Sequence, residues 1–347
     1  MKKTIIAFSM LLLGFSQQSF AQFGFGGNQQ SETTAQYSEK FADLNYVGDD
    51  QAYHTLDIYL PKTPAPQGGY PVIVHIYGSA WFSNNSKGMA DINTICARLL
   101  EAGYAIVTPN HRSSSDAKYP AQINDIKAAI RWVRGNAEKY NFNKNLVGTS
   151  GFSSGAHLAS LCAATNGIKI AEKNNAKYDI EGNLGQYTNE RSDVFACCEW
   201  SGPIDLMNMD CDGVPKTGMK PEDALMGFAF PGHEDEYDLL SPAYFIGVNK
   251  ARVAPIRVNH GLKDNVVPQC QGKELYDVLA ANNIEGCSFH FEPEGGHGFN
   301  MYNKENLDAM VKHFEEAKSI KKLLSVEVTV KNSAKKSQKT KKTSKKK

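Results

Sequence analysis

A serine flanked by glycines is the residue of this 347-residue chain whose setting most directly suggests chemistry. The run GFSSG, residues 151–155, lies between a predicted strand and a predicted helix. There, Ser153 would occupy a strained turn that raises its hydroxyl above a sheet, and the two glycines would leave room for the chain to pass. Ser153 is therefore the candidate nucleophile. Ser150 is not, because its own frame, GTSGF, lacks the second glycine.

Two later loops supply a carboxylate and an imidazole that would serve such a nucleophile. Asp264 follows the apolar run 254–261, and His297 lies between two glycines after the run FHFEP. Of the nine histidines, His297 alone follows the candidate acid in a glycine-flanked loop. The imidazole would take the proton from Ser153, and the ionised carboxylate would fix the imidazole tautomer. The three motifs together predict acyl transfer through a Ser-His-Asp triad.

Strand-like and helix-like segments alternate along the body of the chain, and they must position these residues. Strands are expected at 54–60, 70–77, 104–110, a short run ending at 147, 193–200, 254–261 and 287–293. Helices are expected at 89–102, 120–140, from 154 onward, 269–282 and 304–317. This rhythm predicts an α/β fold with a mostly parallel central sheet covered by helices on both faces. Such sheets carry their sites at the carboxyl ends of the strands, where all three candidate residues fall.

The two ends of the chain differ from the body. Residues 1–21 combine early lysines, a short apolar run and small residues near Ala21, which predicts a cleaved signal peptide. The apolar run is too short for the roughly 20 residues of a membrane span, and no cysteine follows the cut for a lipid anchor. We expect a flexible lead-in at 22–43, one folded domain at 44–320, a lysine-rich disordered tail at 321–347, and a secreted or periplasmic location.

The distribution of charge along the chain argues against a nucleic-acid partner. Outside the lysines of the two ends, acidic residues outnumber basic ones, so no nucleic-acid partner is expected. The basic tail is either a solvated end or a contact for a polyanionic surface.

The chain has seven cysteines, in no zinc-binding pattern, so at least one is unpaired within an exported chain. Cys197 and Cys198 are expected in the core, and Cys270 with Cys287 is the candidate disulfide.

With these motifs assembled, the chain resembles the α/β-hydrolase superfamily. Within it, the chain is similar to secreted bacterial esterases related to feruloyl and acetylxylan esterases and to hormone-sensitive-lipase-like enzymes. The similarity runs from about Leu44 to Phe314 and is carried by LDIYLPK, the run 102–143, GFSSGAHLA, CEWSGPIDL, HGLKDNVVP and GGHGF. The resemblance implies an α/β-hydrolase catalytic domain with Ser153, Asp264 and His297 as its triad, and neither a metal nor an organic cofactor.

The resemblance also implies an oxyanion hole, although its motif is altered here. The group's HGGGW falls on residues 77–81, YGSAW, so main-chain N–H groups of Ser79, Ala80 and Ser154 become the expected donors, and Trp81 the expected wall of the substrate pocket. Ser79 and Ala80 carry side chains, so we expect a turn without left-handed angles at these two positions. The group's histidine is replaced by Tyr77.

The function that follows is a serine carboxylesterase that forms an acyl-enzyme and removes small acyl groups, acetyl or feruloyl, from plant polysaccharides or their oligomers. One alternative is a prolyl-type serine peptidase, which shares the fold and triad order but usually carries a large preceding domain. The other is a non-catalytic binding protein on the same fold. His157 is expected to be a structural histidine, and Arg112 and Asp205 to be structural or rim residues.

Overall fold

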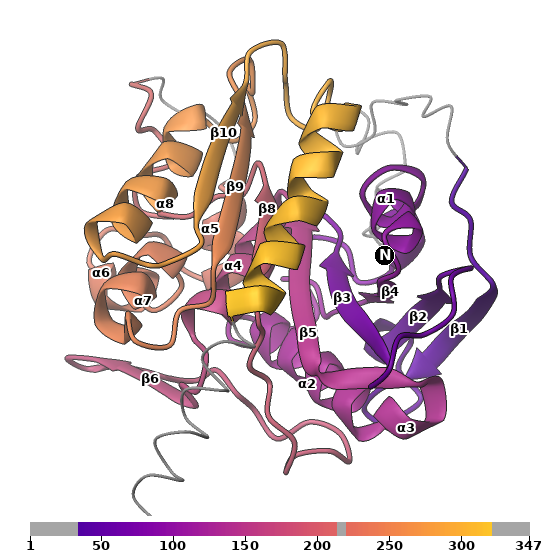
Figure 1. Ribbon diagram of the computed structural model, residues 1–347. Coiled ribbons are helices and arrows are strands. Elements are labelled where there is room, and N and C mark those ends of the chain that lie inside the picture. The colour runs from indigo at the N-terminus through magenta and orange to yellow at the C-terminus, as the bar shows by residue number, and fades with distance from the viewer. Residues whose placement is uncertain (1–33, 214–219, 321–347) are drawn as a thin grey trace, which may run out of the picture.

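An eight-stranded, mostly parallel sheet forms the centre of the molecule (Figure 1). The computed structural model describes residues 34–213 and 220–320. The strands, in spatial order, are β1 (Glu39–Asn45), β2 (Thr55–Leu60), β4 (Ala105–Pro109), β3 (Tyr70–Ile76), β5 (Phe142–Phe152), β8 (Cys197–Trp200), β9 (Ile256–Gly261) and β10 (Ser288–Glu292). Strands β1 and β2 run antiparallel to their neighbours, and every pair from β4 to β10 is parallel. The expected fold class, an α/β-hydrolase fold, is confirmed.

Helices cover both faces of the sheet, and the alternation of apolar residues along the strands explains why. In β3, Val72 and Val74 belong to one hydrophobic core and Ile73 to another, because successive side chains of a strand point to opposite faces. The first core is closed by the helices α2 (Ala121–Gly135), α4 (Ser154–Ala164), α7 (Pro242–Asn249) and α8 (Gln269–Ala281). The second is closed by α1 (Ala97–Glu101) and a helix at 304–320, which lies across the front of the sheet in Figure 1.

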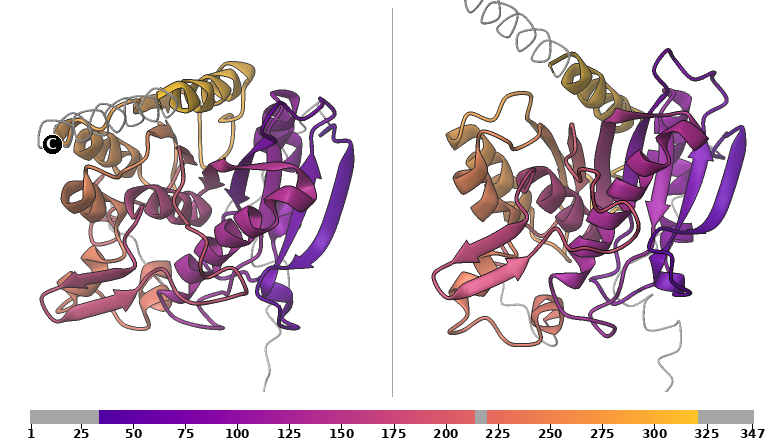
Figure 2. Two further views of the ribbon diagram at one scale, coloured as in Figure 1. Left: turned by 60° about the horizontal axis from the view of Figure 1, so that its bottom comes forward. Right: turned by 90° about the horizontal axis from the view of Figure 1, so that it is seen from below.

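The remaining elements are short and lie at the periphery. A separate antiparallel hairpin of β6 (Ile170–Lys173) and β7 (Ala176–Asp179) projects away from the central sheet, as Figure 2 shows. The other short helices are η2 (Ala52–His54), η3 (Lys87–Met89), η4 (Ile92–Cys96), α3 (Ala137–Tyr140), α5 (Pro221–Met226) and α6 (Glu234–Asp238). Within 34–213 and 220–320, no helix combines the length and apolarity needed to cross a membrane.

The observed boundaries differ from the predicted ones in several places. Strand β5 continues to Phe152 beyond the predicted end at Val147, and the helix predicted at 89–102 is divided into η3, η4 and α1. Strand β1 begins at Glu39, inside the stretch expected to be a flexible lead-in, because it pairs with β2 and its Phe41 ring packs against Tyr140. The helix expected over 120–140 is interrupted at Asn136, whose ψ of 14° is not helical. The predicted signal peptide, most of the lead-in and the lysine-rich tail lie outside the described residues.

The expected disulfide is wrong. Cys270 bonds to Cys211, which lies 59 residues earlier in the chain, and the Cα atoms are 6.1 Å apart. The Sγ atom of Cys287 instead accepts a hydrogen bond from the backbone N–H of Ile256. Cys197 and Cys198 are fully buried on β8, as predicted.

Candidate active site

Ser153 lies on a sharp turn between β5 and α4. Its φ of 55° and ψ of −126° are rarely adopted by residues with a side chain, and its N–H donates to the Trp200 carbonyl at 2.9 Å. A Cβ atom at Gly151 would lie 2.3 Å from the Gly155 carbonyl oxygen, and one at Gly155 would lie 2.1 Å from the Ile76 carbonyl oxygen. The two glycines are therefore required by close backbone packing, as expected for a strained strand-to-helix turn.

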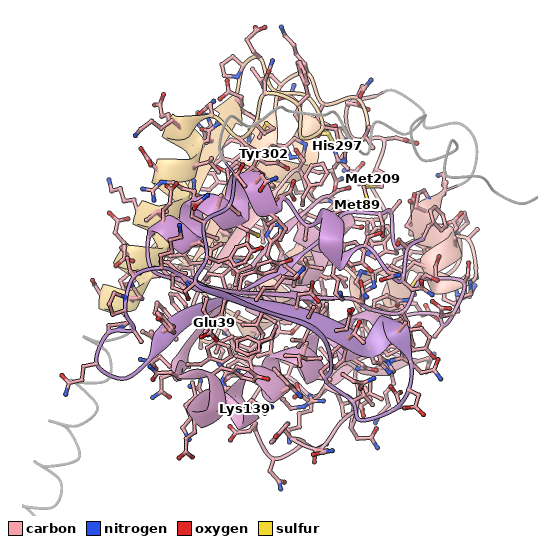
Figure 3. The ribbon with its side chains drawn as sticks, turned by 90° about the vertical axis from the view of Figure 1, so that its right-hand side faces the viewer. Glu39, Met89, Lys139, Met209, His297 and Tyr302 are labelled. Carbon is pink, nitrogen blue, oxygen red and sulfur yellow. A yellow bond between two sulfur atoms is a disulfide. The ribbon has the colours of Figure 1, made fainter. Side chains whose placement is uncertain are left out.

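Three side chains that are distant in sequence form one hydrogen-bonded chain at this turn. The Nε2 atom of His297 lies 3.0 Å from Ser153 Oγ, and its Nδ1 atom lies 2.8 Å from Asp264 Oδ2. Ser153 is 3 % exposed and His297 8 % exposed. Asp264 follows β9 and His297 follows β10, so the three residues meet at the carboxyl ends of the strands. Figure 3 shows His297 at the opposite end of the molecule from Lys139, which lies where β5 begins.

The surroundings of Asp264 keep its carboxyl group ionised. Burial alone would raise its pKa, but the charge and hydrogen bond of His297 and the neighbouring His260 lower it below its ordinary value. Its Oδ1 atom also accepts two backbone N–H groups, those of Val266 and Val267, each at 2.9 Å. Because an ionised carboxylate only accepts hydrogen bonds, the proton of a neutral His297 lies on Nδ1. The Nε2 lone pair is then directed at the Ser153 hydroxyl.

The loop after β3 covers the Ser153 turn, but its backbone differs from the prediction. Ala80 has a φ of 50° and Trp81 a φ of 60°, so the expectation of a turn without left-handed angles is wrong at Ala80. Gly78 is needed for close approach rather than for a positive φ, since a Cβ there would lie 2.8 Å from both the Phe152 carbonyl oxygen and Ser153 Cβ. The backbone N–H of Ser79 donates to Ser154 Oγ at 2.9 Å.

Comparison with known proteins shows the family of this chain. The family model described as BD-FAE matches residues 56–279, which include Ser153 and Asp264. The chain belongs to the BD-FAE family.

Relatives of this BD-FAE chain include curated and structurally characterised proteins. Esterase LipQ of Mycobacterium tuberculosis is 26 % identical over 76 % of this chain and 58 % of its own length. The acetylxylan esterase of Xylanibacter ruminicola is 24 % identical over 76 % of this chain and 47 % of its own. A solved structure titled "Truncated form of carbohydrate esterase from gut microbiota" is 41 % identical, with a TM-score of 0.76 over 82 % of this chain and 97 % of that one. The chain thus spans about half the length of these two curated relatives.

Aromatic residues hold the loop after β3 in place. Tyr77, at the position of the expected histidine, stacks on His111 with 4.9 Å between ring centroids, and its hydroxyl donates to the Ser83 carbonyl at 3.0 Å. The Trp81 ring contacts His157 edge-on at 5.2 Å, and Trp81 is only 3 % exposed. Its role as a wall of the substrate pocket stays a prediction. His157 is structural, as predicted, since its Nε2 lies 2.9 Å from the Leu240 carbonyl and burial lowers its pKa to about 4.

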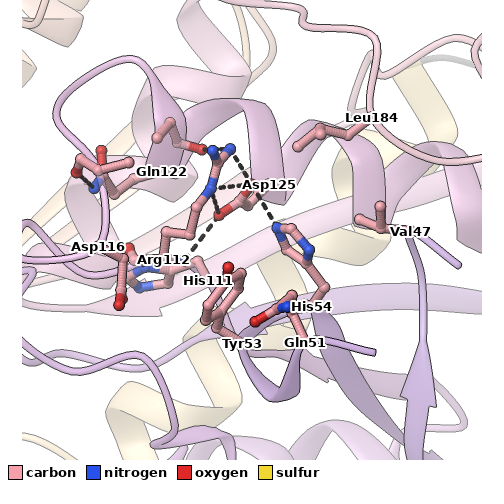
Figure 4. Close-up of polar contacts among 12 residues, drawn as sticks. Val47, Gln51, Tyr53, His54, His111, Arg112, Asp116, Gln122, Asp125 and Leu184 are labelled. Carbon is pink, nitrogen blue, oxygen red and sulfur yellow. Dashed lines mark hydrogen bonds and ion pairs between the residues drawn. The ribbon is translucent and has the colours of Figure 1, made fainter. Parts of the chain in front are cut away.

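Arg112 has the structural role that was expected. Its guanidinium contacts both carboxylate oxygens of the fully buried Asp125, with Nη2 2.6 Å from Oδ1 and Nε 3.0 Å from Oδ2 (Figure 4). The opposite side of this pair is occupied by His54, whose Nε2 lies 3.5 Å from Asp125 Oδ1 and whose Nδ1 lies 2.7 Å from Asp49 Oδ2. This cluster joins the segment after β4 to the start of α2 and to the turn before β2.

Asp205 lies in a loop whose backbone is held by Gln271, a residue that was not anticipated from the sequence. Gln271 is fully buried, and its Oε1 accepts the N–H groups of Ile204 and Asp205 at 2.7 and 2.8 Å. Its Nε2 donates to the carbonyls of Asp205 and Asn208. Together with the adjacent disulfide of Cys270, Gln271 ties the loop after β8 to the start of α8, directly after the loop that carries Asp264.

Two further residues near the site were not anticipated. The ring centroids of Phe152 and His297 lie 4.7 Å apart, so Phe152 of the GFSSG run helps to position the imidazole. Glu199, on β8 opposite Gly151, is fully buried, and burial raises its pKa to about 8. A charged residue inside an apolar strand was the available sequence signal for Glu199. Among the described residues, no group of three or more histidine, cysteine or acidic side chains is arranged to hold a metal ion.

Proposed function

We propose that this chain is a serine carboxylesterase that acts through Ser153, His297 and Asp264. The observation that carries the proposal is the hydrogen-bonded chain from Ser153 Oγ through His297 to Asp264, at 3.0 and 2.8 Å. Membership of the BD-FAE family and the esterase relatives support the same reaction class. A buried serine, imidazole and carboxylate in this order have the arrangement required for nucleophilic acyl transfer.

The mechanism follows from the positions of the three side chains. Ser153 Oγ attacks the ester carbonyl while His297 Nε2 takes its proton, and Asp264 stabilises the imidazolium that forms. The carbonyl oxygen becomes an oxyanion, to which the main-chain N–H groups of Ala80 and Ser154 donate hydrogen bonds. His297 then protonates the leaving alcohol, and an acyl-Ser153 ester remains. Water, activated by the same imidazole, attacks this ester and releases the acid and free Ser153.

The substrates we propose are small acyl esters, acetyl or feruloyl, on plant polysaccharides or their oligomers. Support comes from relatives whose names include an acetylxylan esterase and a carbohydrate esterase. We further propose that residues 1–21 direct export to the periplasm or the exterior, and that the lysine-rich tail contacts a polyanionic surface. Truncation at Lys331 should then reduce the salt-dependent retention of the protein on an acidic polysaccharide. Unchanged retention would dispose of the tail proposal.

Replacing the nucleophile tests the reaction class. Ser153→Ala should lower the turnover of p-nitrophenyl acetate by several orders of magnitude, because the acyl-enzyme cannot form. Ser150→Ala is the matched control, since Ser150 is also buried, lies on β5 just before the turn, and its Oγ has no hydrogen-bond partner among the described residues. Ordinary esterase turnover by Ser153→Ala would refute the assignment.

A substrate panel tests the specificity. We expect release of acetate from acetylated xylan or of ferulate from feruloylated arabinoxylan, together with hydrolysis of short synthetic esters. Faster cleavage of a prolyl amide than of any ester would instead support a peptidase. No turnover on the whole panel would support a binding protein.

A further inference from the structure

The side chain of Ser154 joins the two backbone segments of the candidate site. Ser154 is the first residue of α4 and is 1 % exposed, and its Oγ accepts the backbone N–H of Ser79 at 2.9 Å. Ser79 is buried as well. Among the described residues, this is the hydrogen bond that connects the loop 78–82 with the turn 151–155. In the sequence, only the main-chain N–H of Ser154 had an expected role.

This hydrogen bond changes which groups are available to an oxyanion. The Ser79 N–H, expected to be a direct donor, already donates to Ser154 Oγ. Within residues 34–213 and 220–320, no hydrogen-bond acceptor is found for the N–H of Ala80, the N–H of Ser154 or the hydroxyl hydrogen of Ser154. Ser154 therefore has two unused donors directly after the nucleophile, and one of them is on its side chain.

We propose that the Ser154 hydroxyl is a further oxyanion donor, polarised by the Ser79 N–H. The proposal rests on the proposed function, because it needs Ser153 as the nucleophile. A hydroxyl that accepts one hydrogen bond becomes a stronger donor in the next. In this arrangement Ser79 N–H donates to Ser154 Oγ, and Ser154 Oγ–H donates to the oxyanion. No covalent bond forms or breaks at Ser154, and each proton stays on its own heavy atom.

The location of Ser154 favours this role. The hydroxyl stands at the N-terminal turn of α4, where the unsatisfied N–H groups and the helix dipole stabilise negative charge. Both partners lie in a buried environment, where a hydrogen bond to a charged oxygen is worth more than in water. The N–H of Ser79, which falls on a glycine of the HGGGW motif, donates to this hydroxyl. A direct main-chain donor at residue 79 is thus replaced by a relay through a side chain.

The test compares Ser154→Ala with Ser154→Thr, which keeps the hydroxyl, and with Ser150→Ala as the control. With p-nitrophenyl acetate, Ser154→Ala should lower kcat by about 10- to 100-fold with KM within about twofold, because an oxyanion donor acts on the tetrahedral state. This loss is smaller than the roughly 10²- to 10³-fold typical of one lost donor, because the substitution frees the Ser79 N–H, which compensates in part. Ser154→Thr should keep kcat within a few-fold, and Ser150→Ala should match the unmodified enzyme. A trifluoromethyl ketone, which forms a tetrahedral adduct with the nucleophile, should bind Ser154→Ala more weakly in proportion to the loss of kcat/KM.

The outcomes separate this proposal from a purely structural role. Unchanged kcat in Ser154→Ala would overturn it, as would a lower kcat with unchanged affinity for the trifluoromethyl ketone. If Ser154→Thr does not fold, as judged by its thermal unfolding curve, the inhibitor affinity of Ser154→Ala decides alone. Loss of activity in Ser153→Ala together with normal activity in Ser154→Ala would refute only the role of the Ser154 hydroxyl as an oxyanion donor. Normal activity in Ser153→Ala would instead refute the proposed function.

Discussion

Glu199 offers a prediction whose size follows from its surroundings. Its carboxyl group is fully buried on β8, where Oε2 accepts the Gly202 N–H at 2.9 Å and Oε1 has no partner among the described residues. Burial raises its pKa from about 4.5 to about 8. The folded protein therefore holds a proton on Glu199 at neutral pH, whereas the unfolded chain has released it. Glutamine has the shape of the protonated acid and does not titrate, so Glu199→Gln isolates this effect.

The sign of the effect is set by proton linkage. Between pH 4.5 and 8 the folded state binds the extra proton, so the stability contributed by Glu199 falls as pH rises. The slope is about 1.4 kcal/mol per pH unit, which sums to about 5 kcal/mol over the window. We expect Glu199→Gln to gain stability relative to the unmodified protein from pH 5 to pH 8, and the difference to level off above pH 8.

The assay is urea unfolding of both proteins at several pH values, because other titrating groups cancel in the difference between them. Glu138→Gln, at an exposed position of α3, is the matched control for the loss of one carboxyl group. A stability difference between Glu199→Gln and the unmodified protein that does not vary from pH 5 to pH 8 would refute a buried, protonated Glu199.

Three further substitutions test the triad and the cluster in Figure 4. Asp264→Asn should lower kcat on p-nitrophenyl acetate by about 10⁴-fold, because the neutral amide no longer fixes the His297 tautomer, and a loss below tenfold would contradict this. Burial would lower the pKa of His54, but the carboxylate of Asp125 helps to raise it above its ordinary value of about 6.5. The imidazolium therefore stabilises the fold fully below about pH 6.5, and this stabilisation is lost as the pH rises through the raised pKa. His54→Gln should therefore lose most stability at low pH, and a pH-independent loss in urea unfolding would exclude a charged His54. Arg112→Ala should cost about 3 kcal/mol or more, because the fully buried Asp125 loses its bidentate partner, and a thermal unfolding midpoint equal to that of the unmodified protein would contradict this.

Much of the architecture was predictable because it depends on local patterns. Alternating apolar strands and helices predicted a mostly parallel sheet, since each pattern is set by the period of one element. The glycines of GFSSG indicated a close approach of backbone segments, and the structure has that approach at Gly151 and Gly155. The three loops predicted to carry Ser153, Asp264 and His297 are those whose side chains hydrogen-bond to one another.

What the sequence by itself determined was the order of elements and the residue types available at the strand ends. The tertiary structure decided which distant groups meet, and that cannot be inferred from local periods. Cys270 pairs with Cys211 because the hydrogen bonds of Gln271 hold the loop after β8 against the start of α8. Ala80 takes a left-handed angle because its loop must turn over the nucleophile, and packing outweighs the backbone preference of a residue with a Cβ. The capture of the Ser79 N–H by Ser154 likewise arises only where two segments 75 residues apart come into contact.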